Sequence, residues 1–149
     1  KMTDLELQQL TQRIAQESFG KSFPYKVVFN RRLKTTGGRY HLNDHHIDIN
    51  PLMLEEFDEA TLIGVIKHEL VHYFVHMLNE KPDHRNPHFQ QLLRAVGGLR
   101  YAPTTSKRRR TPPKLLYQCQ GCGLQYPRQR RINTRKYVCS KCRGRLKLL

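Results

Sequence analysis

A glutamate and two histidines stand at the spacing that metal-assisted hydrolysis requires. His68, Glu69 and His72 form the pattern H-E-x-x-H, within a segment whose apolar residues recur at helical period. Histidines four residues apart on a helix point to the same side, so both imidazoles can bind one zinc ion. Glu69 can then act as general base on a zinc-bound water. The pattern predicts a catalytic zinc site of the kind that hydrolyses amide bonds.

A catalytic zinc ion needs a third protein ligand beyond the two helical histidines. A distant glutamate is nearly excluded, because only two carboxylates follow His72 in the chain. His76 lies about 12 Å along the helix axis from His68, too far to share an ion that His72 also binds. His84 and His88 remain as candidates, and the spacing favours His84 only weakly.

Four cysteines form a second candidate metal site near the C-terminus. Their spacing is C-x2-C-x16-C-x2-C, and four such thiolates satisfy a tetrahedral structural zinc ion. A module of about 35 residues cannot bury a large core, so the ion would supply much of its folding free energy. The predicted ligands of this zinc ribbon are Cys119, Cys122, Cys139 and Cys142. We therefore expect two zinc cofactors, one catalytic and one structural.

The positive charge of the chain is concentrated in its C-terminal part. The 149 residues include 27 Lys and Arg against 12 Asp and Glu, for a formal net charge of +15, yet all 12 acidic residues precede residue 84. This asymmetry is typical of a protein that binds DNA or RNA. The alternative is a basic surface that is only solvated. Tyr126 and Tyr137 could stack on bases or pack the small core. The candidate nucleic-acid contacts are Arg108, Arg109, Arg110, Arg128, Arg130, Arg131, Arg135 and Lys136.

The sequence carries no pattern for membrane insertion or export. It has no run of 18 apolar residues, which excludes a spanning helix, and Lys1 to Asp4 do not open a signal peptide. We expect a cytoplasmic protein without a membrane partner, in which closely spaced cysteines bind metal instead of forming disulfides. Nothing in the sequence indicates an oligomeric state.

The helices and strands predicted from the sequence must position these candidate sites. Thr3 and Glu6 have capping-box spacing at the start of the first helix, and Asp58 is a predicted N-cap of the helix that carries H-E-x-x-H. Helices are predicted at 3–19, at 51–57, from 58 through the H-E-x-x-H segment, and at 88–96 before Gly97. Strands are predicted at 25–30, 39–42 and 46–50, with turns at 36–38 and 43–45, in a small, mostly antiparallel sheet.

Residues next to the predicted helix could contribute to substrate handling. The strand at 46–50 could hold an extended peptide by strand addition. Tyr40, His45 or His46 could assist an oxyanion. The predicted domains are 1–102 for hydrolysis, 103–114 as a basic linker and 115–149 as the zinc ribbon.

Four motifs, in this order along the chain, resemble those of the SprT-like metallopeptidase family. The motifs are Gly37-Gly38-Arg39-Tyr40, Ile47-Asp48-Ile49-Asn50-Pro51, His68-Glu69-Leu70-Val71-His72 and His84-Arg85-Asn86-Pro87-His88-Phe89. The resemblance covers nearly the whole chain and implies His68, His72 and His84 as zinc ligands. It also implies Glu69 as the catalytic residue. Many relatives have glycine at the position of Arg85 and one residue fewer before the aromatic, which keeps His88 open as a third ligand.

The residues and the resemblance together predict an α+β fold class. The expected architecture is a zincin-like domain with a small antiparallel sheet and an active-site helix, followed by a C-terminal zinc ribbon. The expected function is zinc-dependent hydrolysis of polypeptides, which the resemblance extends to proteins at or near DNA. The alternative is a zinc- and nucleic-acid-binding regulatory protein with little or no proteolytic turnover. A third and weaker alternative is a metal-stabilised partner of RNA.

Overall fold

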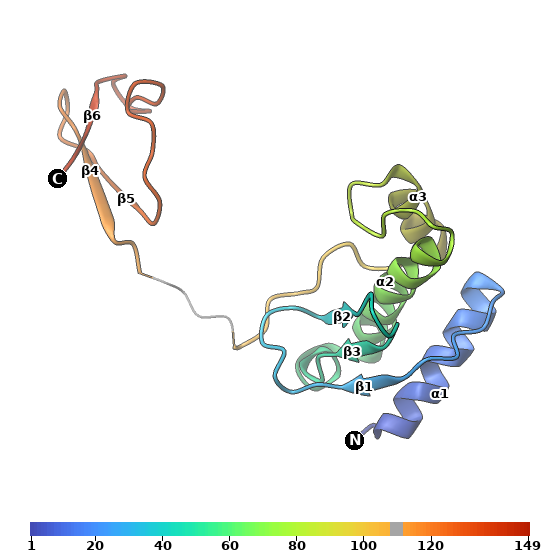
Figure 1. The fold of residues 1–149 in the computed structure, drawn as a ribbon. Coiled ribbons are helices and arrows are strands. Elements are labelled where there is room, and N and C mark those ends of the chain that lie inside the picture. Colours follow the sequence, from blue (N-terminus) through green and yellow to red (C-terminus); the bar gives the residue numbers. More distant parts are fainter. Residues whose placement is uncertain (108–111) are drawn as a thin grey trace. The chain divides into compact units, whose positions relative to one another are not determined.

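The structure, a computed structural model, describes residues 1–107 and 112–149 (Figure 1). The chain divides into two compact units, Lys1–Arg108 and Arg109–Leu149. The first unit contains helices around a small sheet and the second contains strands, so the predicted α+β class is confirmed. Arg108, Arg109 and Arg110, predicted to contact nucleic acid, lie outside the described residues.

The first helix, α1 (Asp4–Ile14), begins at the predicted capping box. Oγ1 of Thr3 accepts the backbone N–H of Glu6 at 3.1 Å, and the Glu6 carboxylate accepts the backbone N–H of Thr3 at 3.1 Å. The helix continues as one π-helical turn, η1 (Ala15–Phe19), and ends at Gly20, whose φ of 66° is left-handed. The helix predicted at 3–19 is therefore confirmed in its extent.

The three strands of the first unit form a mixed sheet. The strands β1 (Val27–Phe29), β2 (Gly38–Tyr40) and β3 (Ile47–Ile49) are arranged in the order β1-β3-β2. The pair β2–β3 is antiparallel as predicted, whereas β1 and β3 are parallel, so the mostly antiparallel expectation is wrong for this pair. All three residues of β3 are buried, and a strand on each side pairs the backbone groups that burial would otherwise leave without partners.

The helix predicted to carry H-E-x-x-H is α2 (Glu59–Met77), which packs against the sheet and α1 (Figure 1). It begins at Asp58, as predicted, where Oδ1 accepts the backbone N–H of Thr61 at 2.7 Å. A π-helical turn, η2 (Met53–Phe57), precedes it where a short helix was expected. Side chains of α1, the sheet and α2 share one core, which includes Leu7, Leu10, Val27, Ile47, Ile49, Leu62, Ile66 and Leu70.

The last helix of the first unit, α3 (Pro87–Val96), covers a second side of α2. Phe89 and Leu93 pack on Val71 and Val75, and the helix ends at Gly97, whose φ is 72°. This helix matches the one predicted at 88–96 with one additional residue at its start.

The chain then returns along α2 and the start of β2. The backbone N–H of Leu99 donates to the carbonyl of Gly64 at 3.0 Å. The side chain of Thr105, which is 4% exposed, donates to the carbonyl of Lys34. The backbone N–H of Ser106 donates to Glu56 at 2.9 Å. Residues 103–107, predicted as linker, thus lie bound on the surface of the first unit.

The second unit is a three-stranded antiparallel sheet with a minimal core. The strands are β4 (Leu115–Cys119), β5 (Gln125–Arg128) and β6 (Leu146–Leu148), in the order β5-β4-β6. Tyr117 and Leu146 are buried together with two of the cysteines. Such a small apolar cluster fits the expectation that a metal ion supplies much of the stability of this unit.

No helix within 1–107 or 112–149 has the length and apolar character that crossing a bilayer requires.

The contact between Gly64 and Leu99 generates a prediction about stability. A Cβ added at Gly64 would come within 2.6 Å of Cγ of Leu99. Alanine is preferred over glycine inside a helix by about 1 kcal/mol. We nevertheless expect Gly64→Ala to lower the free energy of unfolding of the first unit by about 1–3 kcal/mol, because the new methyl group overpacks this contact. Denaturant unfolding followed by circular dichroism measures the change.

Leu99→Ala is the matched variant, since it removes the side chain that the new methyl group meets. The double variant should be more stable than the sum of the two single changes predicts, because the helical preference for alanine is then no longer opposed. Simple additivity of the two changes would contradict this explanation.

Candidate active site and zinc ribbon

Three histidine side chains converge at one point of the first unit. His68 and His72 lie one turn apart on α2, and His84 lies in the loop before α3. The distances between Nε2 atoms are 3.0 Å for His68 and His84, 3.2 Å for His68 and His72, and 3.1 Å for His72 and His84. A tetrahedral zinc ion with bonds of about 2.0–2.1 Å would place its ligand nitrogens about 3.3 Å apart. The donor set and its spacing fit a three-histidine zinc site.

Backbone carbonyl groups orient the two helical histidines. Nδ1 of His68 lies 2.6 Å from the carbonyl oxygen of Leu99, and Nδ1 of His72 lies 2.5 Å from that of Pro82. Donation to these carbonyls places the ring proton on Nδ1 and turns the Nε2 lone pair toward the centre of the cluster. Burial lowers the pKa of both side chains, that of His72 to about 4, which keeps the imidazoles neutral and able to bind a cation.

The turn before α3 presents the third histidine. Oδ1 of Asp83 accepts the backbone N–H groups of Arg85 and Asn86, at 2.8 Å and 3.2 Å. The side-chain amide of Gln90 donates to the carbonyl of His84 at 2.9 Å. These bonds hold the backbone on both sides of His84, so the turn fixes the position of its ring.

Phe89 lies beneath all three imidazoles. Its side chain is fully buried, and its ring centroid is between 4.5 Å and 5.6 Å from those of His68, His72 and His84. The packing of this one side chain therefore joins α3 to the histidine cluster.

His88 points away from the cluster. Its Nδ1 atom lies 2.8 Å from Oε2 of Glu80, and its side chain is 43% exposed. The hydrogen bond from His88 is the main cause that lowers the pKa of Glu80. Of the two candidates that the spacing left open, the structure brings His84, and not His88, to the helical pair.

Glu69 is buried beside the histidines, between α2 and the edge of the sheet. Its residue surface is 5% exposed, and burial raises the pKa of its carboxyl group to about 8, partly offset by a hydrogen bond from the backbone N–H of Tyr40. A Cβ at Gly38 would come within 2.9 Å of the Glu69 side chain. Glycine at this position therefore allows β2 to pass directly over the carboxylate.

A cleft of about 650 Å³ opens over this cluster. Its walls include the three histidines, Glu69, residues 35–40 and 42, residues 81–83, and residues 99–102. The strand that borders it is β2, which lies at the sheet edge, whereas β3 is paired on both sides. The expectation that the strand at 46–50 accepts a peptide by strand addition is therefore wrong, because its backbone groups are already paired.

The three candidates for assisting an oxyanion occupy different environments. Tyr40 lines the cleft, but its hydroxyl lies 2.7 Å from Nδ1 of His45 and 2.7 Å from Nδ1 of His76. His45 is not among the residues that line the cleft, and its Nδ1 atom contacts the hydroxyl of the lining residue Tyr40. His46 belongs to a separate group of polar side chains on the hairpin between β2 and β3.

The four cysteine sulfurs gather in the second unit. Sγ of Cys119 lies 3.4 Å from Sγ of Cys142, and Sγ of Cys122 lies 3.7 Å from Sγ of Cys139, with all four sulfur atoms within 4.8 Å of one another. None of the four is in a disulfide. Four converging thiols are the donor set of a structural zinc site, as the spacing predicted.

Local hydrogen bonds lower the pKa of two of these thiols, Cys119 and Cys139, and so favour their thiolate form. Backbone N–H groups of Gly121 and Cys122 point at Sγ of Cys119, at 3.3 Å and 3.4 Å. The hydroxyl of Tyr126, 3.2 Å from Sγ of Cys139, is the main cause that lowers the pKa of this thiol to about 6. A Cβ at Gly144 would come within 2.6 Å of Sγ of Cys119, so the second knuckle requires glycine there.

The basic residues of the ribbon that the structure describes are on its surface. Tyr126 is half-buried and donates toward the cluster, so it packs the ribbon. Tyr137 is 53% exposed, and Nζ of Lys136 lies 5.5 Å from its ring centroid. The exposed candidates for nucleic-acid contact are Arg128, Arg130, Arg131, Arg135 and Lys136.

Comparison with known proteins assigns both units. The model of the SprT-like family matches residues 7–109, and the model of the SprT-like zinc ribbon domain matches residues 113–149. This chain belongs to the SprT-like family. Protein SprT-like of Lactiplantibacillus plantarum is 53% identical over 148 residues, covering 99% of this SprT-like chain and 100% of the relative. Protein SprT-like of Enterococcus faecalis is 48% identical, covering 97% of this chain and 94% of the relative.

A relative from Bacillus cereus, also named Protein SprT-like, is 41% identical over 99% of this chain and 97% of its own length. Among solved structures, the crystal structure of the metallopeptidase zymogen of Pyrococcus abyssi abylysin is similar, with a TM-score of 0.49 and 20% sequence identity. That similarity covers 63% of this SprT-like chain and 82% of the other chain.

Several residues that shape the SprT-like site were not singled out from the sequence. The carbonyl groups of Pro82 and Leu99 act through the backbone, so side-chain type gives no signal for them. The glycine pair at 37–38 was assigned to a turn. Gly38 instead begins β2, where the absence of a Cβ allows the strand to lie against the Glu69 side chain.

Zinc quantification on variants tests both metal sites. Equilibrium dialysis followed by elemental analysis should show that His84→Ala binds one zinc ion fewer than the wild type, because the cluster then lacks its third nitrogen. His88→Ala should keep the wild-type zinc content, and Cys119→Ser should lose one zinc ion from the ribbon. Loss of zinc from His88→Ala with retention in His84→Ala would contradict the arrangement described.

Proposed function

We propose that this SprT-like protein is a zinc-dependent metallopeptidase that hydrolyses polypeptides. The observation that carries the proposal is the convergence of His68, His72 and His84 in a cleft that also contains the buried carboxylate of Glu69. A three-histidine donor set leaves a fourth position of a zinc ion open to water or substrate. A general base beside that position completes the group needed for amide hydrolysis.

Each protein group has a distinct part in this chemistry. A zinc ion held by the three histidines would supply Lewis acidity toward the substrate carbonyl and lower the pKa of an attacking water. Glu69 accepts the proton of that water at a carboxylate oxygen and returns it to the amine leaving group. The backbone N–H of Tyr40 holds the carboxylate in place, and the carbonyls of Leu99 and Pro82 hold the helical histidines.

The edge strand β2 supplies a means of holding an extended polypeptide. On the side of β2 that faces β3, the carbonyl of Gly37 accepts the N–H of Asn50, and the N–H of His41 donates to the carbonyl of His46. Because the bonding direction alternates along a strand, the backbone of Gly38 and Tyr40 faces the opposite side, where the cleft lies. The backbone N–H of Tyr40 is already bonded to Glu69, so a peptide at this edge would pair with the other outward-facing backbone groups of Gly38 and Tyr40 and would pass directly over Glu69.

Glu69→Gln tests the proposed reaction. We expect zinc content to remain at the wild-type value while the rate of cleavage of an unfolded protein substrate falls by about 10²–10⁴-fold, because the amide cannot accept the proton. Gel electrophoresis of the substrate and zinc analysis measure the two quantities. Glu17→Gln, at an exposed position of the first unit, is the matched control and should cleave at the wild-type rate.

The same measurement separates the metallopeptidase from the alternative of a zinc- and nucleic-acid-binding regulatory protein. If wild type with its zinc content complete cleaves no substrate, with or without nucleic acid, the metallopeptidase proposal is wrong. A loss of activity in Glu17→Gln equal to that in Glu69→Gln would also contradict the assigned role of Glu69.

We further propose that the basic ribbon binds nucleic acid and so directs proteolysis to proteins at or near DNA, in a cytoplasmic setting. Residues 112–149 contain no acidic residue, the basic side chains named above are exposed, and Lys136 lies beside the exposed ring of Tyr137. Cations beside an exposed aromatic ring suit phosphate binding and base stacking. Four free cysteines that share one metal site are consistent with a reducing compartment.

Substitution of ribbon arginines tests this partner. The combined variant Arg130→Ala, Arg131→Ala and Arg135→Ala should weaken binding to nucleic acid and reduce the slope of log K against log salt by about 0.7–0.9 for each phosphate that is no longer neutralised. Fluorescence anisotropy with single-stranded DNA, duplex DNA and RNA measures affinity and preference. The control Lys21→Ala, Lys26→Ala removes exposed cations of the first unit and should leave the slope unchanged. Equal effects of both variants would contradict a ribbon interface.

A further inference from the structure

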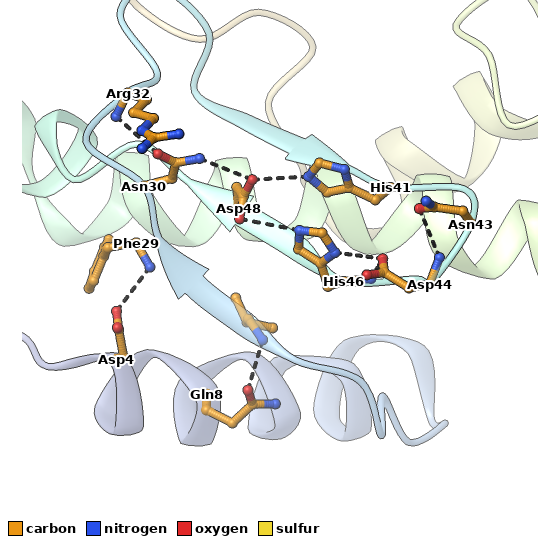
Figure 2. A network of polar contacts seen from close by, with 11 residues as sticks. Asp4, Gln8, Phe29, Asn30, Arg32, His41, Asn43, Asp44, His46 and Asp48 are labelled. Atoms are coloured by element: carbon orange, nitrogen blue, oxygen red, sulfur yellow. Dashed lines mark hydrogen bonds and ion pairs between the residues drawn. The ribbon is translucent and has the colours of Figure 1, made fainter.

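A second group of metal-ligating side chains lies on the hairpin between β2 and β3, outside the cleft. His41 follows β2, His46 precedes β3, and Asp48 is the middle residue of β3 (Figure 2). The backbone N–H of His41 donates to the carbonyl of His46 at 3.0 Å, which sets the two imidazoles side by side. A left-handed residue in the turn, His45 with φ of 65°, allows this close return of the chain.

The Asp48 carboxylate is the centre of this group. Ile47 and Ile49 point into the apolar core, so Asp48 faces the opposite side of the sheet, and its side chain is only 10% exposed. Nε2 of His41 lies 3.0 Å from Oδ2, and Nε2 of His46 lies 3.5 Å from Oδ1. Figure 2 shows both rings turned toward the carboxylate from the same side of the hairpin.

Neighbouring side chains hold two members of the group in orientations that suit metal binding. The amide of Asn30 donates to Oδ2 of Asp48 at 3.2 Å. Nδ1 of His46 lies 2.5 Å from Oδ1 of Asp44. A carboxylate at this distance keeps the ring proton on Nδ1, as in the carboxylate–histidine–metal arrangements of known metal sites.

Because Asp44 keeps the proton of His46 on Nδ1, a positive charge is needed beside the other ring nitrogen, Nε2. When His46 is neutral with its proton on Nδ1, its Nε2 atom presents a lone pair. That lone pair faces an oxygen of the buried Asp48 carboxylate, and two such acceptors repel each other unless a positive charge lies between them. Either a second ring proton or a bound cation can supply the charge.

We propose that His41, His46 and Asp48 bind a divalent transition-metal ion of the zinc type, at a site separate from the histidine cluster of the cleft. Two imidazole nitrogens and one carboxylate oxygen form a donor set typical of zinc and its first-row neighbours and not of calcium or magnesium. One ligand atom from each residue can be chosen so that all three lie within 4.8 Å of one another. Each imidazole nitrogen lies near one carboxylate oxygen, His41 at 3.0 Å from Oδ2 and His46 at 3.5 Å from Oδ1, and ligands of a tetrahedral ion are about 3.3 Å apart.

Binding requires a rotation of the imidazoles. The rings of His41 and His46 are stacked, with centroids 3.7 Å apart and planes 13° from parallel. Parallel rings cannot both direct an in-plane lone pair at one ion, so the rings must rotate apart about χ2 as the ion enters. Their side chains are 22% and 28% exposed, which leaves space for this movement on the solvent side.

A zinc titration of the full-length protein tests the proposal. Zinc alone is the probe, added at mildly alkaline pH to protein whose metal content is followed by isothermal calorimetry and elemental analysis. The double variant His41→Ala, His46→Ala should bind one ion fewer than the wild type. His88→Ala, which removes a histidine paired with Glu80 elsewhere on the first unit, should bind the wild-type number.

A milder variant separates a metal site from a merely structural cluster. Asp44→Asn keeps all three proposed ligands but weakens the support of His46. We expect it to bind the wild-type number of ions with an affinity for the hairpin ion reduced by about 10–100-fold. Circular dichroism melting of each variant checks that the first unit remains folded.

Equal numbers of bound ions in the wild type and in a folded double variant would overturn the proposal. The positive charge between His46 and Asp48 would then be a second ring proton on His46. An unchanged hairpin affinity in Asp44→Asn would also contradict the proposed role of His46. The comparison counts ions by difference, so its result does not depend on whether the protein is a peptidase.

Discussion

The close approach of three imidazole nitrogens is the constraint on which the first unit depends. Nε2 atoms of His68, His72 and His84 lie 3.0–3.2 Å apart, with their lone pairs directed at one another. Without a cation this arrangement is repulsive, and it exists because the surrounding fold leaves the rings little alternative. Carbonyl groups fix two rings from behind, a turn at Asp83 delivers the third, and Phe89 packs beneath all of them.

The ligands of the two candidate zinc sites of the SprT-like chain are brought together in different ways. Each half of the ribbon site is local, because a cysteine pair two residues apart forms a knuckle whose own backbone N–H groups face the sulfur. The cleft site joins one helix to a loop and relies on a carbonyl that follows α3. The ribbon has only a small apolar cluster, so we expect a bound metal ion to supply much of its stability, whereas the first unit has an apolar core that can hold its histidines in advance.

Local patterns made much of the fold and site predictable. The capping box at Thr3, the N-cap at Asp58, the H-E-x-x-H helix and the two cysteine knuckles are encoded by residues a few positions apart. The parallel pairing of β1 with β3 and the choice of His84 over His88 depend on contacts between distant segments. Spacing alone carries little information about such contacts, because alternation within a strand is the same whichever neighbour it pairs with.

The bound position of residues 99–107 determines how short a working form of the first unit could be. Leu99 supplies the carbonyl that orients His68. Thr105 and Ser106 then bind to Lys34 and Glu56, so the segment after Leu99 stays on the surface of the first unit. A fragment that stops at the end of α3 would contain every side chain of the candidate active site. It would nevertheless lack one wall of the cleft and the acceptor that sets the tautomer of a zinc ligand. The unit that forms the candidate active site is thus longer than the span of that site's side chains.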